Sequence, residues 1–274
     1  MYAFLRFPGF KRKALTLSYD DGTIHDKKFV EMIDKYGLKC TFNLNSGLMG
    51  VGRRMPKEEA LTLFKDSHHE IALHGEMHVG FLDVPKEMIV KDVVNDKNAL
   101  EEMFGRIIPG MAYAYGDFND DAVDVLEKCG VMYSRTCVQT ERFDIPTDWL
   151  RWPATIHHAH TEKLFALADK FLDDTPARHM WADEPRLFYV FGHSYEFNDA
   201  GNWDMWEEFL QKVSGKDNVW YATNLEICEY VKAYDSLVFS YDGKIIKNPS
   251  SIDVYTSFFG KEILIGAGET VNLR

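Results

Sequence analysis

Residues 14–22 read Ala-Leu-Thr-Leu-Ser-Tyr-Asp-Asp-Gly, a β-prone apolar run that ends in two carboxylates and a glycine. We predict a buried strand over residues 14–19 that carries Asp20 and Asp21 at its carboxyl end. In isolation, Asp-Asp-Gly is more typical of a turn or a helix cap than of a catalytic site. At a strand end, however, the two side chains can diverge, and two carboxylates held close in a dry site repel each other unless a positive charge lies beside them. The stretch therefore predicts a strand that ends in a cation site.

The alternation of strand, turn and helix continues along the chain. Residues 24–36 carry apolar side chains at helical spacing and are closed by Gly37, and residues 40–44 follow as a strand. Further helices are predicted at residues 56–64, 86–104, 120–129 and 161–172, and further strands at 70–73, 111–115, 131–134 and 187–191. Such alternation indicates parallel strands joined by crossovers. At this length we expect an α/β fold, a closed or distorted (β/α) barrel of about seven strands, with functional groups at the carboxyl ends of the strands.

From about residue 235 the pattern changes to short strands. Residues 237–241 and 244–247 flank Asp242-Gly243, a dipeptide suited to a hairpin turn. Further strands are predicted at residues 252–259, 262–265 and 270–273. We expect residues 1–234 to form a catalytic barrel and residues 235–274 a small β extension packed on it, because so short a segment cannot build a stable core of its own.

Charge and composition limit the partners and the compartment. The chain has a formal net charge of −12 and no long basic run, so the backbone of a nucleic acid would be repelled. No secretory signal is seen at residues 1–10 and no apolar run of ~20 residues follows, so we expect a cytoplasmic protein without a membrane partner. The four cysteines are widely spaced and form no CxxC, which favours buried reduced thiols over disulfides. The oligomeric state stays open.

A second apolar run, residues 70–73, ends in His74, and His78 follows four residues later. This spacing lets both imidazoles reach one ion at metal–nitrogen distances of ~2.0–2.1 Å. Two histidines and one aspartate would leave a position open for water on a zinc-like ion, as catalytic sites require. The pair therefore predicts a catalytic metal site shared with the carboxylates of the first strand.

A third polar group, His193, follows the apolar run 187–191 through Gly192. A histidine buried at the barrel rim is the structural alternative, but its near-neutral reference pKa suits a general acid once a metal site is granted. Three more histidines are close together in sequence: His157, His158 and His160. Because no carboxylate stands at ligand spacing beside them, we expect a loop or rim position rather than a second metal site.

Together these residues resemble the polysaccharide deacetylases, carbohydrate esterase family four, over about residues 14–230. Residues 18–22 resemble the family's first motif, residues 39–42 the strand that follows it, and residues 67–78 the second motif, which ends in His-x-x-x-His. The resemblance implies a distorted β/α barrel and a divalent metal bound by one aspartate and two histidines. It also implies a role for each residue: Asp20 as general base, Asp21, His74 and His78 as metal ligands, and His193 as general acid.

The third motif of that family, typically Arg-x-Pro-Tyr-Gly, is only partly present at residues 111–116. Tyr115 fits, and the resemblance makes its backbone N–H an oxyanion donor. The arginine that orients the base is replaced by Ala112, and Arg135 and Arg151 are the two candidates to substitute for it. The fourth motif, which tunes the acid, has as its candidates Asp148-Trp149 and Trp152-Pro153.

These features predict a metal-dependent hydrolase that removes acetyl groups, most of all N-acetyl groups, from an amino-sugar oligo- or polysaccharide. The cofactor implied is one divalent ion, Zn²⁺ first, with Co²⁺, Ni²⁺ or Mn²⁺ as alternatives. A related hydrolase of a small non-sugar amide or cyclic imide is the alternative that the missing arginine favours. A carbohydrate-binding protein with an inactive site is the second alternative, and the complete set of site residues argues against it.

Overall fold

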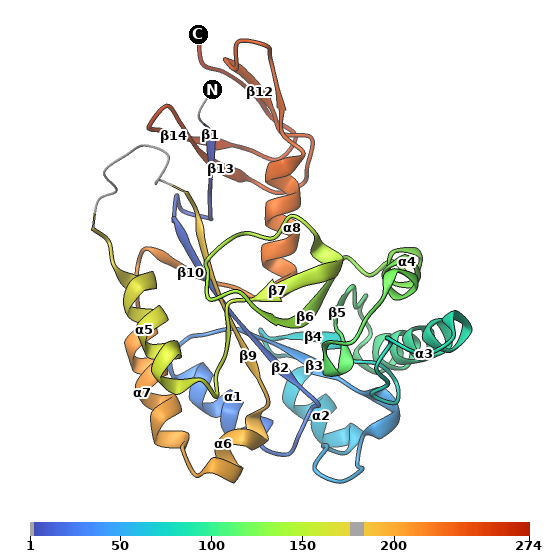
Figure 1. Cartoon of the computed structure of the whole chain (residues 1–274). Coiled ribbons are helices and arrows are strands. Elements are labelled where there is room, and N and C mark those ends of the chain that lie inside the picture. Colours follow the sequence, from blue (N-terminus) through green and yellow to red (C-terminus); the bar gives the residue numbers. More distant parts are fainter. Residues whose placement is uncertain (1–2, 176–183) are drawn as a thin grey trace.

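The centre of the molecule is a nine-stranded, all-parallel sheet that curls into a barrel (Figure 1). It is seen in a computed structural model that describes residues 3–175 and 184–274. Along the sheet the order is β7-β6-β5-β4-β3-β2-β9-β8, with β10 beside β2. The strands are β2 (Lys13–Asp20), β3 (Cys40–Leu44), β4 (Glu70–Leu73), β5 (Gly110–Ala112), β6 (Tyr133–Gln139), β7 (Trp152–Ala154), β8 (Ile156–His157), β9 (Arg186–Gly192) and β10 (Val219–Tyr221).

One broken strand closes the ring. β7 pairs with β6 and β8 pairs with β9, and between them the Thr155 N–H donates to the Tyr189 carbonyl at 2.9 Å. Residues 152–157 therefore join the two ends of the sheet. Counted as one strand, β7 and β8 give a ring of seven with β2, β3, β4, β5, β6 and β9. The predicted distorted barrel is confirmed.

Helices pack around the barrel between successive strands (Figure 1). The described ones are α1 (Asp26–Lys35), α2 (Lys57–Phe64), α3 (Lys86–Phe104), α4 (Asp120–Lys128), α5 (Thr161–Leu172), α6 (Ser194–Ala200), α7 (Trp203–Val213) and α8 (Asn224–Asp235). The first five match the predicted helices to within two residues at either end. α6, α7 and α8 were missing from the prediction, although Thr223 and Glu226 form a capping box at the start of α8.

The strand that opens the barrel is buried throughout: all eight residues of β2 are buried. Both faces of the strand are covered, because Thr16 and Ser18, which alternate with the apolar residues of 14–19, are as buried as those residues. Its Tyr19 ring packs against Phe29 of α1, with ring centroids 4.0 Å apart. This packing fixes the end of β2, and with it the position of Asp20.

Two small antiparallel sheets lie at the other end of the barrel, above it in Figure 1, away from the carboxyl ends of the strands. One sheet contains β1 (Ala3–Arg6), β13 (Val254–Phe258) and β14 (Lys261–Ile265), and the other contains β11 (Val238–Phe239), β12 (Ile245–Lys247) and β15 (Thr270–Asn272). The predicted hairpin around Asp242-Gly243 is confirmed by the pairing of β11 with β12. The small sheets form the expected appendage, and the N-terminal strand β1 is part of it.

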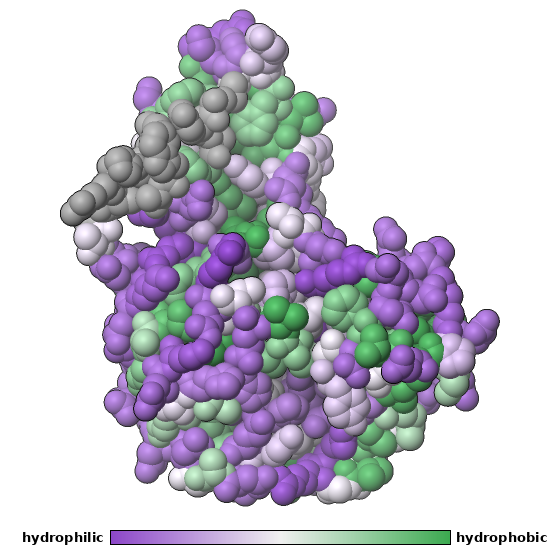
Figure 2. All heavy atoms as spheres, viewed as in Figure 1, coloured by the Kyte–Doolittle hydropathy of each residue, from purple (hydrophilic) through white to green (hydrophobic). Residues whose placement is uncertain are grey.

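The surface is mostly hydrophilic in the view of Figure 2, and hydrophobic side chains gather on the upper lobe, over the small sheets. Below them a shared core joins the lobe to the barrel: Leu5 and Phe7 cluster with Ile227 and Tyr230 of α8. Within the described residues, no helix is both long and apolar enough to cross a membrane.

Candidate metal centre and active site

The two carboxylates at the end of β2 point in different directions because the backbone turns sharply between them. Asp20 ends the strand and is only 3% exposed. Asp21 has a φ of +77°, in the left-handed region that non-glycine residues rarely adopt. Gly22 continues this turn with a φ of +60°, and a Cβ there would lie 2.6 Å from Leu44 Cδ2. Because of this strained turn, Asp20 points to Arg135 while the adjacent Asp21 points to His74 and His78.

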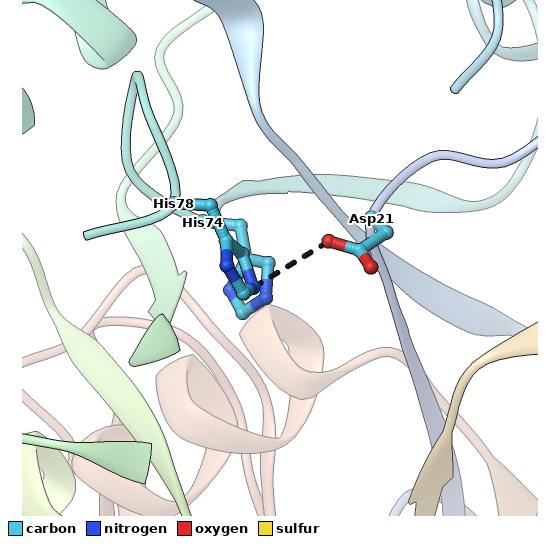
Figure 3. A group of neighbouring side chains, drawn as sticks. All are labelled: Asp21, His74 and His78. Atoms are coloured by element: carbon cyan, nitrogen blue, oxygen red, sulfur yellow. Dashed lines mark ion pairs between the residues drawn. The ribbon is translucent and has the colours of Figure 1, made fainter. Parts of the chain in front are cut away.

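Asp21 meets His74 and His78 at the carboxyl ends of β2 and β4 (Figure 3). One ligand-type atom from each of the three side chains lies within 4.8 Å of the others. His78 Nε2 and Asp21 Oδ1 are 3.5 Å apart. Atoms bound to one tetrahedral metal at ~2.0–2.2 Å are themselves ~3.3–3.6 Å apart, so this separation already suits a shared ion.

The hydrogen bonding of His74 leaves its Nε2 free to bind a metal. His74 Nδ1 lies 2.8 Å from the Ala112 carbonyl oxygen, to which only an N–H can donate. Nε2 is then unprotonated in the neutral ring, and it is buried without a hydrogen-bond partner in the described part of the chain. Burial lowers the pKa of His74, and burial together with the His74 charge lowers the pKa of His78 to about 4. Both rings are neutral near pH 7, as metal ligands must be.

Two other clusters in the described ranges bring ligand-type atoms equally close: Asp34 with His68 and His69, and Glu196 with His157 and His193. Their imidazoles are hydrogen-bonded the opposite way. The Cys40 N–H donates to His69 Nδ1 at 3.3 Å, and the Ala159 N–H donates to His157 Nδ1 at 3.2 Å. In both rings the neutral form must then carry its proton on Nε2, the atom that faces the carboxylate. These two clusters are suited to hydrogen bonding, whereas the cluster of Asp21, His74 and His78 is suited to metal binding.

Asp20 is held by Arg135, which is wholly buried. Arg135 Nη2 pairs with Asp20 Oδ2, and Asn43 Nδ2 donates to Asp20 Oδ1 at 2.7 Å. Burial is the largest influence and would raise the pKa of Asp20, but the Arg135 charge, together with the nearby histidines and the Asn43 hydrogen bond, lowers the pKa to about 2. Arg135 stands beside Ala112 in the register of β5 and β6, so the arginine reaches Asp20 from the neighbouring strand. Arg151, the other candidate, is partly exposed and pairs with Asp120 and Asp148.

His193 stands where β9 passes into α6, and Glu196 of that helix faces it. The His193 N–H donates to Glu196 Oε2 at 3.1 Å, and His193 Nδ1 lies 3.5 Å from the same oxygen. Burial would lower the pKa of His193, but the hydrogen bond to Glu196 and the charge of Asp20 raise it above its usual value. Glu196, rather than the candidates Asp148-Trp149 and Trp152-Pro153, is thus the acidic residue beside His193. Asp148 pairs with Arg151, and Trp152 lies in the core.

Glu196 also gathers the neighbouring histidines. His157 Nε2 and His158 Nε2 lie 3.4 and 3.2 Å from its Oε2. No carboxylate stands at ligand spacing beside these histidines in the sequence; the one that reaches them in the fold comes from α6, 38 residues after His158 in the chain. His158 is buried and contacts the Tyr19 hydroxyl through Nδ1 at 3.1 Å. The sequence signal for Glu196 was its place three residues after His193, a helix-capping spacing.

Tyr115 lies beside the metal cluster. The predicted strand 111–115 ends earlier, at Ala112, because Tyr115 adopts a φ of +58° in a tight turn. Its ring is 68% exposed and meets the His78 ring edge-on, with centroids 4.5 Å apart. Gly116 follows with a φ of +75°, where a Cβ would come within 2.6 Å of Cys137.

Helix α3 holds the loop that carries His74 and His78. Asp96 accepts the backbone N–H of His74 at 3.1 Å and that of Ser46 at 2.9 Å. One turn earlier, Asp92 accepts the backbone N–H groups of Glu76 and Met77 at 3.1 and 3.0 Å. Four backbone donors therefore converge on two carboxylates of one helix face, which fixes the loop against α3.

Comparison with known proteins bears on the family and the fold. Residues 8–134 match the family model described as polysaccharide deacetylase. No curated protein sequence matches the chain. A solved structure from Mycobacterium smegmatis, assigned to the polysaccharide deacetylases, superposes with a TM-score of 0.64 at 16% identity, over 85% of this chain and 95% of that chain.

Two further solved structures share the fold. Puue allantoinase superposes with a TM-score of 0.62 at 12% identity, over 81% of this chain and 91% of that one. A family 4 acetyl xylan esterase from Clostridium thermocellum, solved with a cobalt ion, superposes with a TM-score of 0.53 at 13% identity, over 78% of this chain and 90% of that chain. At such identities the likeness shows a common fold.

Proposed function

Because the chain belongs, through residues 8–134, to the polysaccharide deacetylase family, we propose that it is a metal-dependent hydrolase that removes N-acetyl groups from an amino-sugar oligo- or polysaccharide. One observation carries the metal dependence. The buried Nε2 of His74 has no hydrogen-bond partner in the described residues, and it faces a neutral His78 and the Asp21 carboxylate. These three side chains would hold the ion. The site residues themselves remain part of the proposal.

The ion would supply Lewis-acid polarisation of the scissile carbonyl and a lowered pKa for water in its coordination shell. Zn²⁺ suits two imidazoles and one carboxylate best, and Co²⁺, Ni²⁺ and Mn²⁺ are the alternatives.

Asp20 would act as the general base. Its pKa of about 2 keeps the carboxylate ionised at every working pH, and Arg135 and Asn43 fix its orientation. A carboxylate with so low a pKa has little affinity for a proton, so its contribution to catalysis comes mainly from its position. Asp20 Oδ2 lies 3.9 Å from His74 Nε2, the nitrogen that would bind the metal. Asp20 therefore accepts the proton of the attacking water when the water adds to the carbonyl.

His193 would act as the general acid. Glu196 raises the pKa of His193 and so favours the protonated ring near neutral pH. Glu196 also takes the Nδ1 side of the ring, so that Nε2 is left to donate to the departing amine. The backbone N–H of Tyr115 would stabilise the oxyanion of the tetrahedral intermediate. The products are acetate and a free amino sugar.

The test is acetate release from N-acetylglucosamine oligomers by metal-stripped protein supplied with Zn²⁺, Co²⁺, Ni²⁺ or Mn²⁺. Asp20→Asn is expected to keep the metal and lose turnover by ~10²–10⁴-fold. His74→Ala is expected to lose the metal as well. Full activity of either variant would contradict the assignment. A protein that neither binds the metal nor releases acetate would support the inactive, carbohydrate-binding alternative.

A second candidate is a hydrolase of a small non-sugar amide or cyclic imide, with the same ion and base. The observation that favours it is Ala112, which stands where the family's third motif has an arginine, while Arg135 of β6 holds the base instead. A substrate panel of N-acetylated oligosaccharides, O-acetyl sugars and small amides separates the two. For location we propose the cytoplasm, since all four cysteines are unpaired.

A further inference from the structure

Arg54 stands beside the metal cluster, on the loop between β3 and α2. Its Nη2 lies 2.8 Å from Asp21 Oδ1, the oxygen that also faces His78. Its Nε donates to Asn45 Oδ1 at 3.3 Å. A backbone bridge pairs Arg54 with Thr23, two residues after Asp21. Backbone and side chain together hold this guanidinium at the site.

The guanidinium remains within reach of a ligand. The Arg54 side chain is 21% exposed, and Asp21 is 13% exposed. A guanidinium offers five N–H groups in a rigid fork that matches a carboxylate. Only Nε and Nη2 have partners within residues 3–175 and 184–274, and the Nη1 amino group has none there. Donors are therefore left for a second anion.

The charges at the site point to what that anion could be. Asp20 is neutralised by Arg135, and Asp21 is already neutralised by Arg54. Each of these two carboxylates is thus paired with an arginine, so they would not by themselves cancel the charge of a divalent ion bound there. The site would be locally positive in a chain whose net charge is −12, and it would attract an anionic ligand.

Resting on the proposed function, we propose that Arg54 determines specificity by binding a carboxylate of the substrate. The preferred substrates are then N-acyl compounds that carry a carboxylate near the acylated nitrogen. Neutral amides have no carboxylate for the Arg54 guanidinium to bind. The sugar and non-sugar candidates share this chemistry, and the test distinguishes them.

The experiment uses two matched pairs of compounds with and without a carboxylate. N-acetylmuramic acid is compared with N-acetylglucosamine, and N-acetylglycine with N-acetylglycinamide. Arg54→Met should lower kcat/KM about ten- to a hundredfold for the carboxylate member of the productive pair and leave the neutral member within about threefold. Which pair is productive identifies the sugar or the non-sugar source.

Arg53→Met is the matched control. Arg53 is the neighbouring arginine, and its guanidinium pairs with Asp199 and lies over the Tyr195 ring instead. It should leave both members of each pair unchanged. A wild-type preference for the neutral members, or an equal loss on both members in Arg54→Met, would overturn the proposal.

Two binding measurements separate this inference from the proposed function. Calorimetry on the Asp20→Asn protein should show that N-acetylmuramic acid binds more tightly than N-acetylglucosamine, and that the added change Arg54→Met removes the difference. Metal-stripped Arg54→Met should bind Zn²⁺ at least as tightly as the wild type, because a like charge has been removed. Weaker Zn²⁺ binding would mean that Arg54 only positions Asp21, and would contradict the proposal. If no compound is hydrolysed but N-acetylmuramic acid still binds more tightly than N-acetylglucosamine, the proposed function fails and the carboxylate site stands.

Discussion

At the scale of single residues, the site depends on an arginine that approaches from an unexpected strand. Arg135 of β6 takes the place that Ala112 of β5 leaves open, and it does so from the adjacent register position. What it contributes is electrostatic: without it, burial would raise the pKa of Asp20. Arg135 is the largest of the influences that together outweigh this desolvation and keep the base ionised.

We predict that Arg135→Gln moves the acidic limb of the kcat/KM profile to higher pH. The base works when deprotonated, so activity falls as pH drops through its pKa. With the pKa at about 2, the wild-type limb lies below the usual assay range, and loss of the cation brings it upward. The measurement is kcat/KM against pH, with Arg151→Gln as the control on the partly exposed arginine. An acidic limb that does not move would refute this account of Asp20.

Residues close together in sequence were the predictable part of the site. Asp20 and Asp21 share one strand end, and His74 and His78 share one loop, so their spacing alone grouped them. Glu196 and Arg135 could not be placed in the same way, because they join the site from other strands and helices through the barrel's closure. The sequence also could not show whether the Nδ1 atom of a histidine donates or accepts a hydrogen bond, because backbone groups of the fold decide it. This difference distinguishes the metal cluster from the two other clusters of histidines and carboxylates.

At the scale of elements, α3 acts as a rigid support for the metal loop. The helix boundaries were predicted from its apolar periodicity, but the inward turn of Asp92 and Asp96 was not, since charged residues on a helix usually face solvent. Gly75 of the loop packs against Asp92. It has a φ of +81°, and a Cβ there would lie 2.5 Å from Asp92 Oδ2. The loop and the helix therefore specify one another.

Asp96→Asn should weaken metal binding by about ten- to a hundredfold, as loss of partners behind metal ligands does. The amide can accept at only one of its two ends, so either the His74 or the Ser46 N–H loses its acceptor. Competition with a chromophoric chelator measures the affinity of the metal-stripped protein. Glu102→Gln, an exposed change on the same helix, is the control. Equal affinities for the two variants would count against the support.

At the scale of the whole molecule, the small sheets and the catalytic end are far apart. The sheets lie over the amino ends of the strands, and the site lies at the carboxyl ends (Figure 1). They are nevertheless tied to the barrel: the Tyr230 hydroxyl contacts the Arg6 carbonyl at 2.5 Å and receives the Tyr255 N–H at 2.9 Å. Removal of residues 237–274 would expose the face of α8 that packs against the small sheets and would leave β1 unpaired.

We predict that deletion of residues 237–274 lowers the melting temperature and leaves kcat of the folded fraction close to that of the full chain. The reason is that it uncovers apolar surface far from the site. Calorimetry measures the melting temperature, and acetate release well below the midpoint measures kcat. Tyr241→Ser, at the fully exposed hairpin turn, is the control. An unchanged melting temperature would mean that the two parts are energetically independent.

The pairing of β1 with β13 also orders events during synthesis. The Thr256 hydroxyl donates to the Phe4 carbonyl across 252 positions of the chain. The ring strands can assemble once β9 has left the ribosome, whereas β1 must wait for β13, more than sixty residues later. Until then β1 is an unpaired β segment of the nascent chain, a template for association with other chains. Co-translational chaperones that bind extended segments would therefore find β1 open for longer than the strands of the ring.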